Sequence, residues 1–201
     1  RLTSEGYRVH FVRVVDSEPD NINLITFLKL VIMIAQAYLK SEDVEAAGEV
    51  QIVDASFFSY KHFAQITPTF AKKLLTLVQN AFAYKIKQFH VINAPALVDP
   101  LLKVVSPFLK QKLRNRIYLH RNVESLVDHV PKDMTPEEFG GNAGKMKPHM
   151  DKLIELISGE FNSWLKQQEL LKSDETKRIV RPQWCEDVFG LDGSFKMLNI
   201  D

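Results

Sequence analysis

The chain of 201 residues lacks several features that would have placed it in a familiar class. Its single cysteine, Cys185, cannot form an internal disulfide, which predicts a reducing compartment. Its longest apolar segment, residues 24–39, is interrupted by Lys29 and Gln36, so no bilayer-spanning helix is expected. No secretory signal or initiator Met opens it, so Arg1 is interpreted as a domain start or an artificial boundary, which leaves room for preceding sequence. With 45% hydrophobic residues, the composition predicts one soluble globular domain and a tail.

Enzyme motifs are missing too. There is no G-x-G-x-x-G between a strand and a helix, no phosphate-binding G-x-x-x-x-G-K-[ST], and no G-x-S-x-G nucleophile elbow. The glycine-rich residues 140–144 follow a turn, so they are expected only to bend the backbone. The six histidines show no metal-ligand spacing; they are His10, His62, His90, His120, His129 and His149. We therefore predict no enzyme, no cofactor and no metal site, and we interpret His90 as a hydrogen-bonded core residue on a buried strand.

Positive charge is concentrated in one stretch, although the net charge of the chain is only +1. Residues 84–121 hold eight basic side chains and one acidic one, Asp99; the basic ones are Lys85, Lys87, Lys103, Lys110, Lys112, Arg114, Arg116 and Arg121. The residues between them are aliphatic rather than exposed aromatics that could stack on bases. This pattern disfavours nucleic acid and leaves an anionic ligand or membrane surface as the partner.

Apolar periodicity predicts strands that alternate with helices. The expected strands are residues 6–15, 50–54, 89–92 and 117–119. The expected helices are residues 24–40, two pieces separated by Pro68 (the second spanning 69–84), a long helix after the turn at 93–95 with Asp99 as its N-cap, a short helix at 123–129, and a terminal helix at 150–171. Such alternation predicts an α/β fold with a largely parallel sheet and crossover helices.

The long helix combines an apolar arc with a cationic end. On a helical wheel Lys103, Lys110 and Arg114 lie opposite the arc, whereas Lys112 and Arg116 lie within it at its C-terminal end. Two interpretations fit this pattern. The pair can bind the anionic head of an otherwise apolar ligand or surface. Alternatively, its aliphatic segments can pack on the core while its charged groups remain in water. Pro107 is expected to kink the helix.

An ordered series of motifs resembles the CRAL-TRIO lipid-binding domain family, which includes the alpha-tocopherol transfer protein, cellular retinaldehyde-binding protein and the clavesins. The motifs are Gln51–Asp54, Phe89–Pro95, Ser106–Leu109, Lys112–Ile117 and Pro136–Gly141, and the likeness covers residues 6–161. It implies a lipid-binding domain at 1–165 and a C-terminal tail at 166–201, without the family's N-terminal helical domain. Residues 189–198 resemble the tail of many insect members.

The resemblance implies a non-enzymatic carrier that closes one hydrophobic molecule into a pocket with a sheet floor and a mobile gate at 97–109. Gate residues are Leu97, Val98, Leu102, Val104 and Leu109; expected pocket residues, each equally compatible with ordinary core, are Phe57, Phe58, Phe70, Val91, Leu101, Val105 and Phe108. The phosphoinositide-binding positions of the tocopherol transfer protein correspond to Lys85, Lys87, Lys112 and Arg116, all basic here. A cytoplasmic monomer, peripheral to endosomal or other phosphoinositide-bearing membranes, is the expected state.

Two departures from the family pattern bear on the cargo. Ala55-Ser56 replaces the glycine that commonly follows the second strand, and Ala83-Tyr84 stands where Tyr-Pro is usual. The sequence therefore leaves open whether the cargo is a tocopherol, retinoid, carotenoid, sterol or phospholipid. It also leaves an alternative function open, a regulatory or interaction module that binds a membrane or a protein without transporting a lipid.

Overall fold

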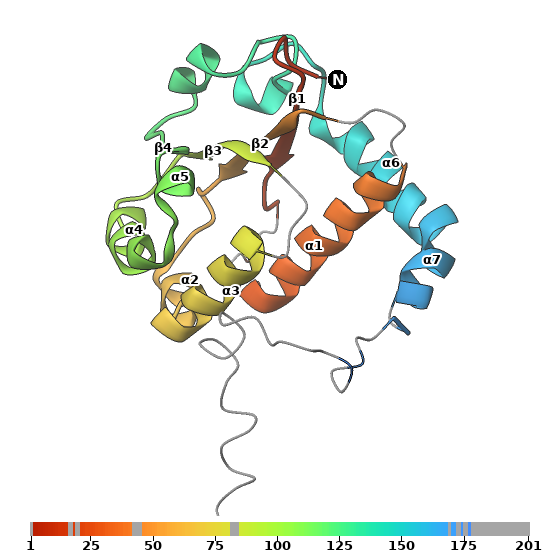
Figure 1. The fold of residues 1–201 in the computed structure, drawn as a ribbon. Helices are drawn as coiled ribbons and strands as arrows, with labels where there is room; N and C mark the ends of the chain where they lie inside the picture. The colour runs from red at the N-terminus through yellow and green to blue at the C-terminus, as the bar shows by residue number, and fades with distance from the viewer. Residues whose placement is uncertain are drawn as a thin grey trace, which may run out of the picture.

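The computed structural model describes residues 2–15, 18, 21–41, 46–80, 85–168, 170–171, 174 and 177. Strands and helices alternate along the chain (Figure 1). The elements are β1 (Tyr7–Val12), α1 (Leu24–Ser41), β2 (Gly48–Asp54), α2 (Tyr60–Gln65), α3 (Pro68–Asn80), β3 (Ile86–Ile92), α4 (Val98–Val105), η2 (Ser106–Phe108), α5 (Gln111–Arg114), β4 (Ile117–Leu119), η3 (Glu124–Asp128), η4 (Glu137–Phe139), α6 (Met146–Ser158) and α7 (Glu160–Gln168), where η marks a 3-10 helix.

The four strands form one parallel sheet in the order β1-β2-β3-β4. Parallel neighbours need a crossover connection, and here each crossover is helical: α1 joins β1 to β2, α2 and α3 join β2 to β3, and α4 to α5 join β3 to β4. The predicted α/β fold with a parallel sheet is therefore confirmed.

The two faces of the sheet are covered by different parts of the chain. In Figure 1 the part of the chain between β4 and α6 lies above the sheet, α1, α2, α3 and α4 lie below it, and α6 and α7 descend along one side beside α1. On the upper face Ile52 and Ile92 are fully buried against Leu126, Val130 and Phe139. This face holds the main hydrophobic core because apolar side chains from the strands and from η3 and η4 close over it.

A glycine pair shapes the turn that closes this core. Gly140 adopts φ 76°, the left-handed region that glycine enters without strain. Gly141 donates its N–H to the carbonyl of Pro136 at 3.0 Å. A Cβ atom on Gly141 would lie 1.9 Å from the carbonyl oxygen of Thr135, so only glycine fits. The pair thus has two different requirements, backbone conformation at the first position and space at the second.

The single long helix predicted after the 93–95 turn is wrong. The chain forms α4 and η2 and then passes through Leu109 and Lys110 in extended conformations, with ψ 127° and 142°, before α5 begins. Pro107 has no N–H to donate to a continuing helix. The predicted N-cap is also wrong, because Leu97 occupies that position and Asp99 lies in the first turn. Wheel angles therefore do not relate Lys112 or Arg116 to the apolar arc of α4.

The terminal helix and the 123–129 helix also differ from prediction. Gly159, at ψ −99°, separates α6 from α7, because this dihedral cannot continue an α-helix. The 123–129 segment forms the 3-10 helix η3 instead of an α-helix. The predicted extension of α3 through 81–84, Cys185, and the tail motif at 189–198 lie outside the described residues.

The glycine pair allows a test of the turn. Gly141→Ala is expected to lower the free energy of unfolding by about 3 kcal/mol, because the new methyl group overlaps a backbone carbonyl. Gly140→Ala meets open space and has only the cost of its left-handed conformation, about 1 kcal/mol. Urea denaturation of both variants measures the difference. Equal losses at the two positions would contradict this account of the turn.

Candidate functional site

The lower face of the sheet is apolar but incompletely covered. Val12, Val53, Val91 and Leu119 are register partners in one row across all four strands, and each is only half-buried. β2 and β3 are internal strands, and their residues on the upper face, Ile52 and Ile92, are fully buried. The burial on the two faces is therefore unequal at the centre of the sheet. Such apolar surface is the expected floor of a hydrophobic ligand site.

A buried polar cluster occupies the β1–β2 side of the same face. Glu49 is only 3% exposed. Its Oε1 accepts a hydrogen bond from Arg8 Nη1 at 3.1 Å, and its Oε2 lies 2.7 Å from His10 Nε2. His10 in turn contacts the ring of Tyr38 in α1, with centroids 5.6 Å apart. This contact shows that α1 covers the lower face. The floor is thus polar beside β1 and apolar across the row of Val53, Val91 and Leu119.

The segment predicted as the gate, 97–109, is held at its N-terminal end by an arginine. Arg121 donates from Nη1 to the carbonyl of Ala94 at 3.0 Å and from Nη2 to Asp99 Oδ2 at 2.5 Å. Just before α4, Asn93 turns the chain with φ 51° and bonds to Asp54 Oδ1 at 3.1 Å. The turn after β3 is therefore fixed to the end of β2, and α4 starts from it.

A glutamine holds the other end of this segment. Gln79 in α3 donates from Nε2 to the carbonyl of Phe108 at 2.9 Å and accepts from the backbone N–H of Lys110 at 2.7 Å. One side-chain amide thereby satisfies both backbone groups where the helix is interrupted. Lys110 Nζ also donates a hydrogen bond to Asn80 Oδ1 at 2.7 Å. The gate segment is consequently fastened to its surroundings by polar contacts at both ends.

Gate and pocket residues show intermediate burial, with two exceptions. Val98 and Leu109 are buried at 5% and 7% exposure. The half-buried ones are Leu97, Leu101, Leu102, Val104, Val105, Phe108, Phe57, Phe58, Phe70 and Val91. Phe57 and Phe58 pack around the fully buried His62, with ring centroids 5.5 and 5.8 Å from it. These two phenylalanines therefore belong at least in part to an aromatic cluster, and the role of the whole set as ligand pocket stays a prediction.

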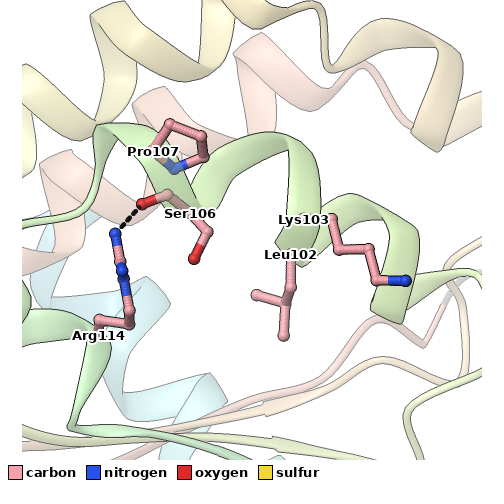
Figure 2. A pocket seen from close by; sticks show the side chains of 5 residues that line it. All are labelled: Leu102, Lys103, Ser106, Pro107 and Arg114. Atoms are coloured by element: carbon pink, nitrogen blue, oxygen red, sulfur yellow. Dashed lines mark hydrogen bonds between the residues drawn. The ribbon is translucent and has the colours of Figure 1, made fainter.

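A pocket of about 420 Å³ lies between α4, η2 and α5. Its lining comprises Leu102, Lys103, Ser106, Pro107 and Arg114, and Leu102 alone was predicted as a gate residue. Figure 2 shows Arg114 reaching back to Ser106, whose carbonyl it bonds at 2.6 Å from Nη2. The sequence placed Arg114 on the solvent side of a continuous helix. It points toward η2 because the helix does not continue through Leu109 and Lys110, whose backbone is extended.

Three of the four predicted phosphoinositide-binding residues, Lys85, Lys87 and Arg116, lie at the N-terminal ends of β3 and β4, and Lys112 lies in α5; their surroundings differ. Lys85 and Lys112 are exposed. Arg116 donates from Nη1 to the carbonyl of Ile86, which joins the starts of the two strands. Lys87 lays its stem across Gly48 and its ammonium 5.0 Å from the centre of the Tyr7 ring. Within the described part of the chain, none of the four pairs with a carboxylate.

The structure also gathers three histidines that are far apart in the sequence. His90 in β3, His120 after β4 and His129 after η3 have ring nitrogens within 4.8 Å of one another. His90 is fully buried and hydrogen-bonded, as predicted. Its burial, followed by the nearby His129 and His120, lowers the pKa of His90 to about 4, and burial also lowers the pKa of His120. Neighbouring parallel strands were the one sequence signal that could have brought His90 and His120 together.

The sequence of this α/β domain matches a known protein family. The model of the CRAL/TRIO domain matches residues 2–141, which is more than half of the chain. The chain belongs to the CRAL/TRIO domain family. The family predicted from the motifs is thereby confirmed, and the matched residues include the sheet, the gate segment and the glycine pair. Among the described residues, no helix has both the length and the apolar character needed to cross a membrane.

Relatives and a solved structure agree with this assignment. The domain is 30% identical over 174 residues to mouse "Alpha-tocopherol transfer protein-like", covering 86% of this chain and 47% of that protein. It is 28% identical over 141 residues to rat "Clavesin-2", covering 70% of this chain and 43% of the relative. The crystal structure of Sfh5 shares the fold, with a TM-score of 0.50 at 13% identity over 74% of this chain and 52% of Sfh5. The chain spans about half the length of the curated relatives it matches.

Replacement of the glutamine that fastens the CRAL/TRIO gate segment provides a test of that contact. Gln79→Leu removes both backbone hydrogen bonds, each worth about 1 kcal/mol, so amide exchange at Lys110 is expected to accelerate by about tenfold. Hydrogen–deuterium exchange with mass spectrometry measures this locally. Asn80→Leu is the matched control, since it removes the bond to Lys110 Nζ and one to the carbonyl of Thr76 within α3 but leaves both backbone contacts of Gln79 in place. Unchanged exchange at Lys110 in Gln79→Leu would show that the amide does not hold the segment.

Proposed function

We propose that this CRAL/TRIO domain binds one small hydrophobic molecule against the lower face of its sheet and transfers it between membranes without chemical change. The observation that carries the proposal is the half-buried apolar row of Val12, Val53, Val91 and Leu119. The names of its relatives support a lipid as the class of ligand. A carrier requires no nucleophile, cofactor or acid–base pair, consistent with the lack of enzyme motifs in the sequence.

Burial of the apolar row supplies the affinity in this proposal. Each square ångström of apolar surface removed from water contributes about 25 cal/mol. A ligand that covers the row gains this energy on both its own surface and the protein's. The polar cluster of Arg8, Glu49 and His10 lies on the same face and offers hydrogen-bonding groups to a ligand that has one polar end. We therefore expect a largely apolar molecule with a small polar group.

Entry of the ligand requires the gate segment to move. Its two ends are held by the Arg121 contacts and the Gln79 amide, which are few and individually modest in energy. A membrane shifts the gate equilibrium only if it binds the open state more tightly than the closed one. The cationic residues at the starts of β3 and β4 lie on the α5 side of the gate, where a membrane contact can provide that difference.

Exposed cations make the expected membrane contact. Lys85 and Lys112 are exposed, and an anionic bilayer attracts each such residue by about 1 kcal/mol. Phosphoinositide head groups add charge-assisted hydrogen bonds, for which Arg116 is suited. Lys87 is partly engaged by the Tyr7 ring. We propose that Lys85 and Lys112 carry the docking, that Arg116 combines docking with fastening the strands, and that the domain acts as a peripheral protein on such membranes.

Enlarging a residue in the apolar row tests ligand binding. Val91→Phe is expected to fill the floor of the site. The fraction of protein that carries a co-purifying hydrophobic molecule, measured by native mass spectrometry, should therefore fall by about tenfold or more relative to the wild type. Val127→Phe, at an exposed position of η3, makes the same chemical change away from that face and is expected to retain the ligand. A wild-type protein isolated from cells without a hydrophobic molecule would contradict the carrier and favour a regulatory or interaction module.

Charge reversal tests membrane docking separately. The double variant Lys85→Glu, Lys112→Glu is expected to weaken binding to phosphoinositide vesicles by about tenfold or more, because two attractive residues become repulsive. Cargo affinity in solution should stay the same. Lys132→Glu with Lys152→Glu gives an equal change in net charge at exposed sites outside the cluster. Vesicle sedimentation at two salt concentrations measures the effect. If both double variants lose binding equally, net charge and not this cluster drives docking.

A further inference from the structure

We propose that His90, His120 and His129 form a binding site for a divalent first-row transition metal ion, with Zn²⁺ as the best-fitting occupant. The site lies on the upper face of the sheet, away from the gate segment and the apolar row, so it is independent of the proposed lipid transport. Imidazole nitrogens are the preferred ligands of Zn²⁺, Cu²⁺ and Ni²⁺, and three of them here have ring nitrogens within 4.8 Å of one another.

The spacing of the nitrogens is close to what a tetrahedral ion requires. With metal–nitrogen bonds of about 2.0–2.1 Å, two ligand nitrogens in a tetrahedral site are separated by about 3.3 Å. His90 Nδ1 and His120 Nε2 are 2.9 Å apart, so their rings need only a small tilt and separation. The widest of the three gaps closes by no more than about 1.5 Å. His129 follows η3 and is the least buried of the three, so it is the ring best able to make that movement.

The far nitrogens of the two buried rings are already oriented by other side chains. His90 Nε2 lies 2.9 Å from Gln88 Oε1, which can only accept a hydrogen bond, so Nε2 carries the proton and Nδ1 keeps its lone pair. His120 Nδ1 lies 2.7 Å from the hydroxyl of Ser125, which can either donate or accept. Outer partners of this kind are the usual support of metal-binding histidines.

Ion binding requires only a proton shift within this network. In the ion-free state His120 donates from Nε2 to His90 Nδ1 and accepts at Nδ1 from Ser125. For His120 Nε2 to bind an ion, its proton moves to Nδ1 and is donated to Ser125, whose hydroxyl then turns to the carbonyl of Asn122, 3.4 Å away. Both rings stay neutral in the two states.

The accessible side of His129 leaves room for entry and for a fourth ligand. Three protein ligands with a solvent-filled fourth position are a common arrangement for Zn²⁺. The bound ion would tie β3 to the segments after β4 and η3, which otherwise meet through the core around Leu126 and Val130. Because the three histidines come together only in the folded state, the ion binds that state and stabilises this half of the domain.

Metal titration of the full chain, purified without a histidine tag and freed of metal, tests the site. The wild-type protein is expected to bind one equivalent of Zn²⁺ by calorimetry, to show the visible absorption of tetrahedral Co²⁺, and to melt at a higher temperature with Zn²⁺ present. His129→Ala is expected to weaken the affinity by at least about 100-fold, because it removes a direct ligand. Ser125→Ala, which removes an outer partner, is expected to weaken it by about tenfold.

Two control variants identify the histidines as the ligands. His149→Ala changes an exposed histidine of α6 outside the cluster, and Cys185→Ser removes the single thiol, so both are expected to bind as the wild type does. Because His129 is the most accessible of the three, its variant should unfold in urea like the wild type, which separates lost binding from lost folding. Absence of stoichiometric binding by the wild type, or equal binding by His129→Ala, would overturn the proposal.

Discussion

Unequal burial of the two faces of the parallel sheet is the constraint on which the rest of this domain depends. Ile52 and Ile92 are fully buried on the upper face, and they anchor the segment that carries η3 and η4. That packing holds the strands firmly from the upper face. The apolar row around Val53 and Val91 can then remain half-covered, which an ordinary two-sided α/β sheet would not tolerate.

A short interruption between η2 and α5 separates the apolar gate segment from the basic residues that follow it. Because the chain becomes extended at Leu109 and Lys110, the helical part before it can cover the sheet while Lys112 in α5 stays exposed. Gln79 makes the interruption stable by bonding the backbone groups that a continuous helix would have satisfied itself. The same break brings Arg114 back to Ser106 and creates the pocket of Figure 2.

Several features were predictable because they depend on local pattern. The order of the strands and the helical crossovers between them, the turn at Asn93, the glycine pair and the family all follow from residue type and spacing, and each was confirmed. The errors occurred where a local pattern continued past a break. Apolar spacing runs smoothly through Leu109 and Gly159, but the backbone does not. It becomes extended at Leu109, after Pro107, and the dihedral of Gly159 ends α6.

The sequence by itself determined the parallel α/β fold, the family and the concentration of positive charge in residues 84–121, because these depend on periodicity, motifs and composition. Only the tertiary structure decided which face of the sheet is left half-covered and what each cation contacts, since Lys87 in β3 meets Tyr7 in β1 across the intervening strand β2. It also decided that His90, His120 and His129 meet. Residues so far apart in the chain become neighbours through strand register and loop closure, which no local spacing records.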